Sequence, residues 1–322
     1  MENKNSSSRK RIIVSSSHID KHNHIITKEA LYSALPFLNG DRKVRFGLDH
    51  NKTFPPLGRI SDGEVIQGED GEYYLVAYQE YFDVIETLTL ASGLKLIRES
   101  FLNENYPFVE CKFKPVDVVE VKYDFVNLGS YNNGKKFAVE LKAETEYNFK
   151  SSEFIRKSEI PDPEIVITLT EVLAIALGFG LKKIPEKIGD AVADDIVKFY
   201  KLLSGVIKKS VTELLPKNRP IHFVVEIPIG ETITELIVTT RNPDLAIKAF
   251  DKSIISNLIG DIRVAINDLG AEKIQFYLNE EKTWEMNYLI TNEGKVIGTK
   301  KSFKKRDDFF QSLVNKQSND NA

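Results

Sequence analysis

Three histidines, His18, His22 and His24, lie close together in the sequence with Asp20 between the first two. Imidazole nitrogens and carboxylate oxygens at such short spacing are ligand types that hold transition metals. The segment is polar and follows a predicted strand, and no distant group of Cys or His residues completes a ligand shell. We therefore predict a solvated loop here, with no metal ion and no cofactor.

A longer stretch, from Val14 to Asp83, places His50 between a short apolar segment and a turn rich in proline and glycine. The residues before His50 read VRFGLD, those after it read NKTFPPLGRI, and the stretch closes with GEDGEYYLVA. This order resembles the N-terminal half of the prohead (capsid-maturation) serine proteases of tailed phages. In that family a strand delivers a histidine just before a Pro/Gly-rich turn and a Gly-Arg-Ile strand start. The resemblance covers roughly a quarter of the chain.

The resemblance implies a catalytic role for His50 and for a serine some fifty residues further on. His50 would be the general base, and the serine position of the family matches Ser100, in IRESF. Ser92, in ASG, is the second candidate for the nucleophile. A third residue that would orient the base is not distinguished among Glu110, Glu120 and Asp124, which all lie on predicted strands. The family's glycine after the serine is absent, so a non-catalytic relative is the other outcome that the resemblance allows.

The predicted N-terminal domain, residues 11–150, is rich in short strands separated by turn residues, which is typical of a barrel-like β unit. A helix is expected from Thr27 to Pro36, and a second over 84–98, broken at Gly93. A hairpin turn is expected at Asn132-Asn133-Gly134. The strands are expected at 11–16, 44–48, 73–78, 108–113 (with Cys111), 118–125 and 136–149.

Residues 151–164 have the composition of a linker, and two predicted helices follow over 165–215. Residues 165–181 carry one charge, Glu171, and 186–215 is amphipathic with helical spacing of its apolar residues. These two helices would form a helical hairpin. Two interpretations of it stay open: the hairpin is buried in the protein, or it engages a membrane surface.

The C-terminal segment, residues 219–303, is predicted to be a small ββαβββ domain followed by a polar tail at 304–322. A hairpin is expected around Gly230, and a helical region from Leu245 to Leu269 that Gly270 ends. Trp284 is expected at a core or interface position on a strand. The whole chain is therefore expected to belong to the α+β class.

The composition narrows the classes of function. The chain has 322 residues, 42% hydrophobic and 28% charged, with a net charge of -3 and a pI near 6.1. This argues against a nucleic-acid partner, which usually requires a basic protein. The one cysteine, Cys111, is typical of a reducing compartment. Residues 1–10 are polar and are expected to be a disordered leader. We expect a cytoplasmic protein, and both association with a membrane surface and formation of a homo-oligomer stay open.

Two hypotheses for function follow. The first is a serine endopeptidase, or an autoprocessing enzyme, acting on a protein or peptide through His50 and Ser100. The second is a non-catalytic protein that binds a peptide or partner, with the helical hairpin engaging a membrane or another subunit, as a bacterial anti-phage or stress effector would.

Overall fold

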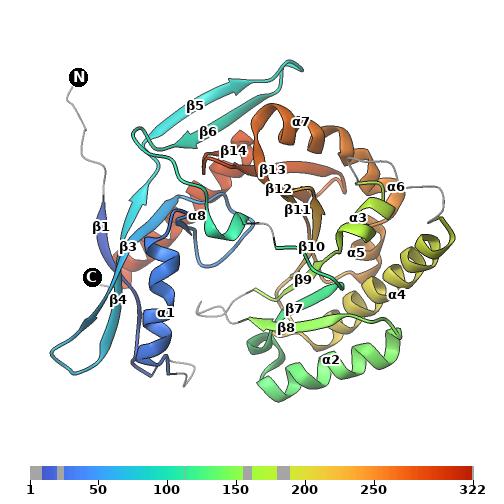
Figure 1. Ribbon diagram of the computed structural model, residues 1–322, viewed down its shortest axis with the longest axis horizontal. Coiled ribbons are helices and arrows are strands. Elements are labelled where there is room, and N and C mark those ends of the chain that lie inside the picture. The colour runs from blue at the N-terminus through green and yellow to red at the C-terminus, as the bar shows by residue number, and fades with distance from the viewer. Residues whose placement is uncertain (1–8, 20–24, 113, 155–161, 180–188, 321–322) are drawn as a thin grey trace. The chain divides into compact units, whose positions relative to one another are not determined.

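The computed structural model describes residues 9–19, 25–112, 114–154, 162–179 and 189–320 (Figure 1). They divide into two compact units. Unit 1 comprises residues up to 48, 54–112 and 290 onward, and unit 2 comprises 49–53 and 113–289. The structure contains both helices (36%) and strands (34%) in two sheets, which is consistent with the predicted α+β class. The units divide the chain after 112 and after 289, whereas the sequence predicted boundaries near 150 and 219.

Unit 1 contains a four-stranded antiparallel sheet in the order β1-β4-β3-β2. Its strands are β1 (Lys10–Ser16), β2 (Val44–Phe46), β3 (Gly58–Gln67) and β4 (Tyr73–Tyr81). Helix α1 (Lys28–Asn39) begins at Thr27, whose hydroxyl accepts a hydrogen bond from the Ala30 amide. Leu31 and Leu38 of α1 pack with Leu75 and Ala77 of β4. The described strands do not close into a barrel. This region is therefore rich in strands, as predicted, but the predicted barrel-like arrangement is wrong.

A second set of strands in unit 1 corrects the helix predicted over 84–98. The segment is a hairpin of β5 (Val84–Thr89) and β6 (Lys95–Ser100), and β14 (Val296–Gly298) pairs with β6. Alternating β-branched residues in VIETLT favour a strand, and Gly93 adopts a φ of 84° in the turn, as a three-residue hairpin loop requires.

Two further expectations in unit 1 are wrong. The strand predicted over 108–113 is a short 3₁₀ helix, η1 (Val109–Cys111), with Cys111 fully buried. The polar tail predicted at 304–322 belongs to helix α8 (Lys300–Asp320). This helix is held by Arg306, whose guanidinium donates to both carboxylate oxygens of Glu99, at 2.6 and 2.8 Å, and to the Pro56 carbonyl.

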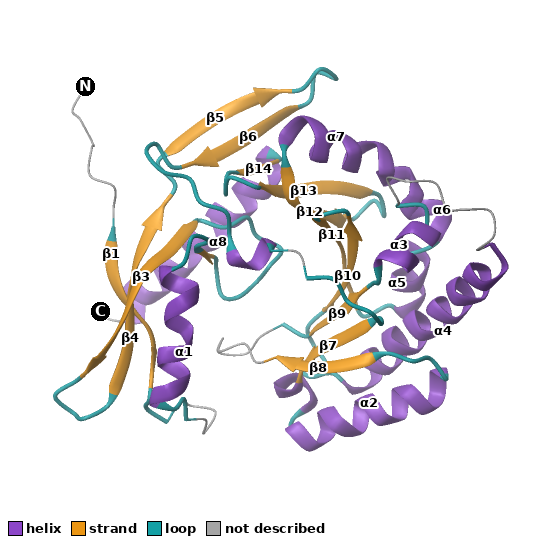
Figure 2. Cartoon of the chain, viewed as in Figure 1, coloured by secondary structure: helices purple, strands orange, loops and turns teal. Residues whose placement is uncertain are grey.

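Unit 2 is built on a sheet in the order β13-β12-β11-β10-β9-β7-β8 (Figure 2). Each of the pairs β7–β8, β9–β10 and β11–β12 is parallel and adjacent, and the partners within each pair are joined through helices. The strands are β7 (Glu120–Asp124), β8 (Lys150–Phe154), β9 (Glu164–Thr168), β10 (Ile221–Ile229), β11 (Thr232–Thr240), β12 (Ala271–Leu278) and β13 (Trp284–Thr291).

The helices of unit 2 pack on the sheet and on one another. Helix α4 contacts α2, α3 and α5, while α3 and α5 also contact β10 and β11, respectively. The helices are η2 (Phe125–Leu128), α2 (Tyr131–Thr145), α3 (Glu171–Ala176), α4 (Gly189–Glu213), α5 (Pro243–Ala249), α6 (Lys252–Ile255), η4 (Ser256–Leu258) and α7 (Ile259–Leu269).

Helix α2 replaces the strand predicted over 136–149 and the turn predicted at 132–134. Ser130 caps the helix by accepting a hydrogen bond from the Asn133 amide. Phe137, Ala138 and Leu141 then recur at helical spacing and are buried. The Asn-Asn-Gly segment lies in the first turn of this helix. Its turn-like composition therefore marks the start of a helix here and not a hairpin.

The apolar helix predicted over 165–181 is also wrong. Residues 164–168 form strand β9, which lies between β7 and β10, and among the described residues up to 179 only the short α3 is helical. Ile165, Val166 and Ile167 are all nearly fully buried, as a parallel strand covered on both faces requires. The second predicted helix is present as α4. Among the described residues, no helix is long and apolar enough to cross a lipid bilayer.

The C-terminal segment has the predicted order of two strands, helices and three strands. The hairpin β10–β11 turns at Gly230, which has a φ of 61°. The helical region from Leu245 to Leu269 is divided into α5, α6, η4 and α7 because Asp251 starts a new helix by capping it. These strands share a sheet with β7–β9, so this segment is not a separate small domain.

Candidate functional site

The two residues expected to form a catalytic dyad lie in different compact units. His50 is exposed and belongs to the segment 49–53 of unit 2, where Asp49 and His50 adopt φ values of 45° and 54°. Ser100 ends β6 in unit 1 and is 6% exposed. The second candidate, Ser92, is exposed in the β5–β6 turn.

The acidic residues considered as orienting groups have other partners. The Glu110 carboxylate accepts a hydrogen bond from the Arg45 amide, and Asp124 accepts one from the Val126 amide at the start of η2. Glu120 accepts a hydrogen bond from the Ser152 hydroxyl at 2.8 Å. Of the predicted His18 cluster, residues 22 and 24 lie outside the described residues, and His18 pairs with Asp70 at 3.1 Å. The described residues contain no group of His, Cys, Asp and Glu arranged to hold a metal ion.

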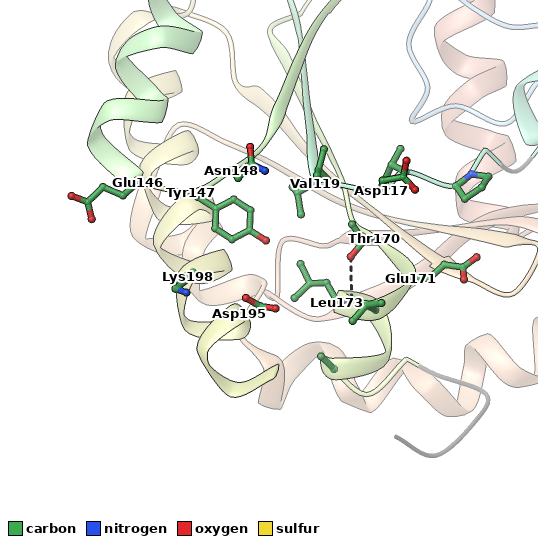
Figure 3. A pocket seen from close by; sticks show the side chains of 15 residues that line it. Asp117, Val119, Glu146, Tyr147, Asn148, Thr170, Glu171, Leu173, Asp195 and Lys198 are labelled. Carbon is green, nitrogen blue, oxygen red and sulfur yellow. Dashed lines mark hydrogen bonds between the residues drawn. The ribbon is translucent and has the colours of Figure 1, made fainter. Parts of the chain in front are cut away.

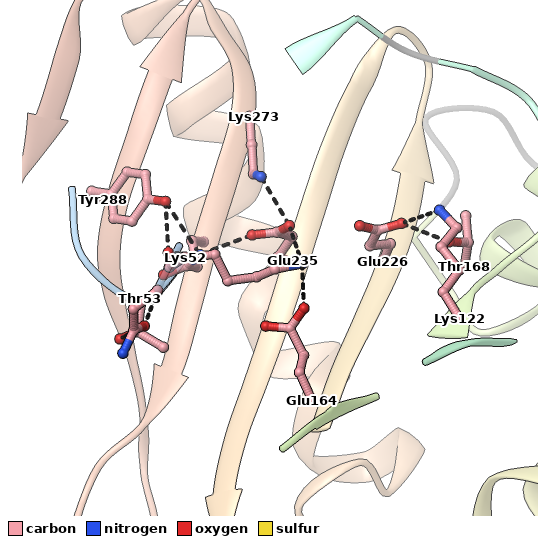
Figure 4. Close-up of polar contacts among 11 residues, drawn as sticks. Lys52, Thr53, Lys122, Glu164, Thr168, Glu226, Glu235, Lys273 and Tyr288 are labelled. Atoms are coloured by element: carbon pink, nitrogen blue, oxygen red, sulfur yellow. Dashed lines mark hydrogen bonds and ion pairs between the residues drawn. The ribbon is translucent and has the colours of Figure 1, made fainter. Parts of the chain in front are cut away.

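A row of charged side chains crosses one face of the unit 2 sheet (Figure 4). The register places Glu226 of β10 directly opposite Glu235 of β11, with Thr168 and Gln275 as the next neighbours on either side. Like charges directly opposite are unfavourable in a sheet. Lysines compensate: Lys122 lies 3.4 Å from Glu226, and Lys273 lies 2.9 Å from Glu235.

Lys52 inserts into this row from outside the sheet. Its ammonium lies 3.4 Å from Glu164 and 3.7 Å from Glu235, while its carbonyl accepts hydrogen bonds from Gln275 and Tyr288. Burial disfavours the ammonium, but the surrounding carboxylates outweigh this effect and raise the pKa of Lys52. Burial likewise opposes the Glu235 carboxylate, and Lys273 and Lys52 nevertheless lower its pKa. Both groups are therefore charged near neutral pH, and the cluster anchors residues 49–53 on the sheet.

His222 forms a second polar contact on this face that the sequence did not single out. Its Nδ1 lies 2.7 Å from the Thr239 hydroxyl, and its Nε2 lies 3.7 Å from Asp162, which also pairs with Arg219 at 3.3 Å. His222 and Arg219 lower the pKa of Asp162 against the effect of its partial burial. These contacts connect the start of β10 with the end of β11 and with the residue pair that precedes β9.

A cavity of about 720 Å³ opens in unit 2 beside the end of β9 (Figure 3). Four parts of the chain line it: residues 115–119 before β7, residues 146–148 after α2, the start of α3, and one face of α4. The floor is apolar, with Val119, Leu173 and Ala176 buried. Pockets at the ends of strands in α/β sheets are a common position for bound ligands.

The charged residues of this cavity are mostly acidic. Four acidic residues line it against one lysine, Lys198, and one of the four, Glu146, pairs with Lys201 at 3.4 Å. The Tyr147 side chain extends into the cavity and Asp195 lies below it (Figure 3). Burial and the nearby Asp195 carboxylate raise the pKa of Tyr147, so its hydroxyl stays protonated and can donate a hydrogen bond. The carboxylates belong to Asp117, Glu146, Glu171 and Asp195.

Comparison with protein-family models, with curated proteins and with solved structures gave no match. The site must therefore be interpreted from its own residues. The sequence marks Glu171 only as the single charge in a predicted apolar helix, and it assigns no role to Tyr147 or Asp195. No sequence motif could reveal the cavity, because its walls come from four segments that only the fold brings together.

Proposed function

We propose that this chain is a non-catalytic binding protein and that the unit 2 cavity takes a cationic side chain of a peptide partner. The observation that carries the proposal is the combination of a cavity of about 720 Å³ with three acidic residues besides the Lys201-paired Glu146, namely Asp117, Glu171 and Asp195, and a single lysine on its walls. The size lies within the usual range for pockets that enclose small ligands or side chains, about 300–1,000 Å³.

The chemistry of the walls favours a long basic side chain, that of arginine or lysine. Such a side chain has an apolar stem and a charged end. The stem matches the buried floor of Val119, Leu173 and Ala176, and the charged end matches Asp195 beside the aromatic ring of Tyr147. A cation near both an aromatic ring and a carboxylate gains from each interaction.

The surroundings of Ser100 support a non-catalytic protein over the serine peptidase. A nucleophile must be reached by its substrate, and Ser100 is 6% exposed within the β5–β6 ladder. Its neighbour Glu99 is engaged by Arg306. We expect a fluorophosphonate probe to leave Ser100 unlabelled in the native full-length chain. Labelling at Ser100 that is lost in His50→Ala would favour the peptidase.

Isothermal titration calorimetry tests the cavity directly. The full chain is titrated with blocked tripeptides that carry a central arginine, lysine or glutamate. We expect binding of the two basic peptides, weakened by added salt because the carboxylates are solvent-accessible, and none of the acidic peptide. Asp195→Asn should weaken binding about three- to tenfold, as expected for losing one partly exposed charge pair.

The matched control is Asp194→Asn, which changes the neighbouring exposed carboxylate on α4 that is not among the cavity-lining residues. It should bind as the unaltered chain does. Equal loss in both variants would show a general charge effect, and absence of binding to either basic peptide would overturn the proposal.

A further inference from the structure

Strand β5 is an edge strand that lacks the usual protection of edges. It is the terminal strand among the described strands of its sheet and pairs only with β6. Edge strands are normally blunted by lysine, proline, a bulge or a covering element because their free backbone groups attract other strands. The sequence VIETLT contains none of these residues, and its register with β6 is regular over all six residues.

The exposed side chains of β5 are Ile85, Glu86, Thr87 and Thr89, one apolar, one charged and two threonines. Ile85 is 69% exposed, and Leu94 beyond the strand is 49% exposed. The single charge of the strand, Glu86, is neutralised by Arg98 across the hairpin, whose Nε donates to it at 2.8 Å. A strand added here would therefore meet two threonines, an exposed isoleucine and a glutamate whose charge is balanced by Arg98.

The backbone groups that face outward follow from the ladder. The Leu90 amide donates to the Leu94 carbonyl, in line with the register that pairs Leu88 with Leu96 and Glu86 with Arg98. Hydrogen-bonded and non-hydrogen-bonded pairs alternate in an antiparallel ladder. The backbone amides and carbonyls of Glu86 and Leu88 therefore form hydrogen bonds with β6. Ile85, Thr87 and Thr89 direct their amides and carbonyls to the open edge.

From this pattern we infer that β5 pairs with β5 of a second copy of the chain, antiparallel and centred on Thr87. In a symmetric pair the outward-facing residues 85, 87 and 89 must lie opposite one another. This condition allows a two-fold axis at Glu86, at Thr87 or at Leu88. Centring on Thr87 pairs Ile85 with Thr89 of the second copy and Thr87 with itself. It is the register that pairs all three outward-facing residues, and Thr–Thr is a favourable cross-strand pair. Centring on Glu86 would place two carboxylates opposite each other, and centring on Leu88 would shorten the ladder.

Cysteine cross-linking tests the register as well as the dimer. In the inferred pair the two Thr87 Cα atoms are about 5.5 Å apart, within the range that a disulfide spans. Thr87→Cys should form a disulfide-linked dimer under mild oxidation, reversed by dithiothreitol. Thr89→Cys is the matched control, because its two copies would be four residues out of register, about 13 Å apart. The native Cys111 is fully buried, so the unaltered chain should not cross-link.

Sedimentation velocity over a range of concentrations measures the association without cross-linking. The unaltered chain should shift from monomer to dimer as concentration rises. Thr87→Pro removes an outward amide while leaving the β5–β6 bonds in place, and it should shift the equilibrium to monomer. Ile85→Lys adds a charge at the edge and should do the same, whereas Val139→Lys, at a 67% exposed position on α2, should not. Circular dichroism confirms that each variant is folded.

A chain that stays monomeric at every concentration, or equal cross-linking through positions 87 and 89, would overturn the inferred pairing. Dimers unaffected by both Thr87→Pro and Ile85→Lys would also overturn it, because the contact would then lie elsewhere.

Discussion

At the scale of single residues, Lys52 is a largely buried lysine of unit 2 that depends on two buried carboxylates for its charge balance. Its side chain is 15% exposed, and its ammonium lies between Glu164 and Glu235, whose side chains are 4% and 1% exposed. Removing one member of a buried charge cluster leaves the others without compensation, which typically costs about 3–5 kcal/mol. The cluster therefore specifies where residues 49–53 lie on the sheet.

Lys52→Met is expected to lower the free energy of unfolding of unit 2 by about 3 kcal/mol. Urea titration followed by fluorescence of Trp284, the only tryptophan, reports this unit. Lys136→Met removes an ammonium from an exposed pair with Glu140 and should change stability by less than about 0.5 kcal/mol. Similar losses in both variants would contradict the role given to Lys52.

The stability of unit 2 should also depend on pH through Glu235. Its pKa is lower in the folded chain than in the unfolded chain, so its stabilising effect is complete above the unfolded value, about 4.3, and is lost as pH falls toward the folded value. The urea midpoint should therefore fall below about pH 5. Glu235→Gln should be less stable at pH 7 and show a weaker decline over the same range.

At the scale of elements, Arg241 completes the end of helix α4. Its guanidinium donates to the carbonyls of Val211, Leu214 and Pro216, and to that of Arg219. The last carbonyls of a helix lack partners within the helix, so this side chain supplies donors to the end of α4 and to the segment that follows it.

Arg241→Lys is expected to destabilise unit 2 by about 2 kcal/mol, because a single ammonium cannot reproduce the planar fork of donors. Hydrogen exchange should show faster exchange in the last turn of α4 and in residues 214–219, with the β10–β11 strands still protected. Arg263→Lys changes an exposed arginine on α7 and serves as the control. Unchanged exchange at the end of α4 would refute the capping role.

At the scale of the whole molecule, the chain carries one intrinsic probe in each unit. Trp284 lies in unit 2, while Cys111, the only cysteine, is fully buried in unit 1. Compact units with their own cores often unfold separately. Lys52→Met should shift the urea transition seen by Trp284, and Arg306→Met, which leaves Glu99 buried and unpaired, should shift the exposure of the Cys111 thiol. If each variant moved both transitions equally, the units would unfold as one.

Local signals in the amino-acid sequence were enough to predict the mixture of helices and strands, the hairpin at Gly230, the start of helix α1 at the Thr27 cap and the order of elements after Arg219. These signals are caps, turn glycines and regular periodicity. They failed at the end of α1, which continues through Pro36 to Asn39, and at residues 84–98, 131–145 and 164–168, where tertiary packing selects the element. Short apolar runs satisfy both a strand and a helix, and burial selects between them. The acidic cavity and the Lys52 cluster could not be predicted from the sequence for a related reason. Their charged residues come from separate segments that meet only when the sheet is assembled.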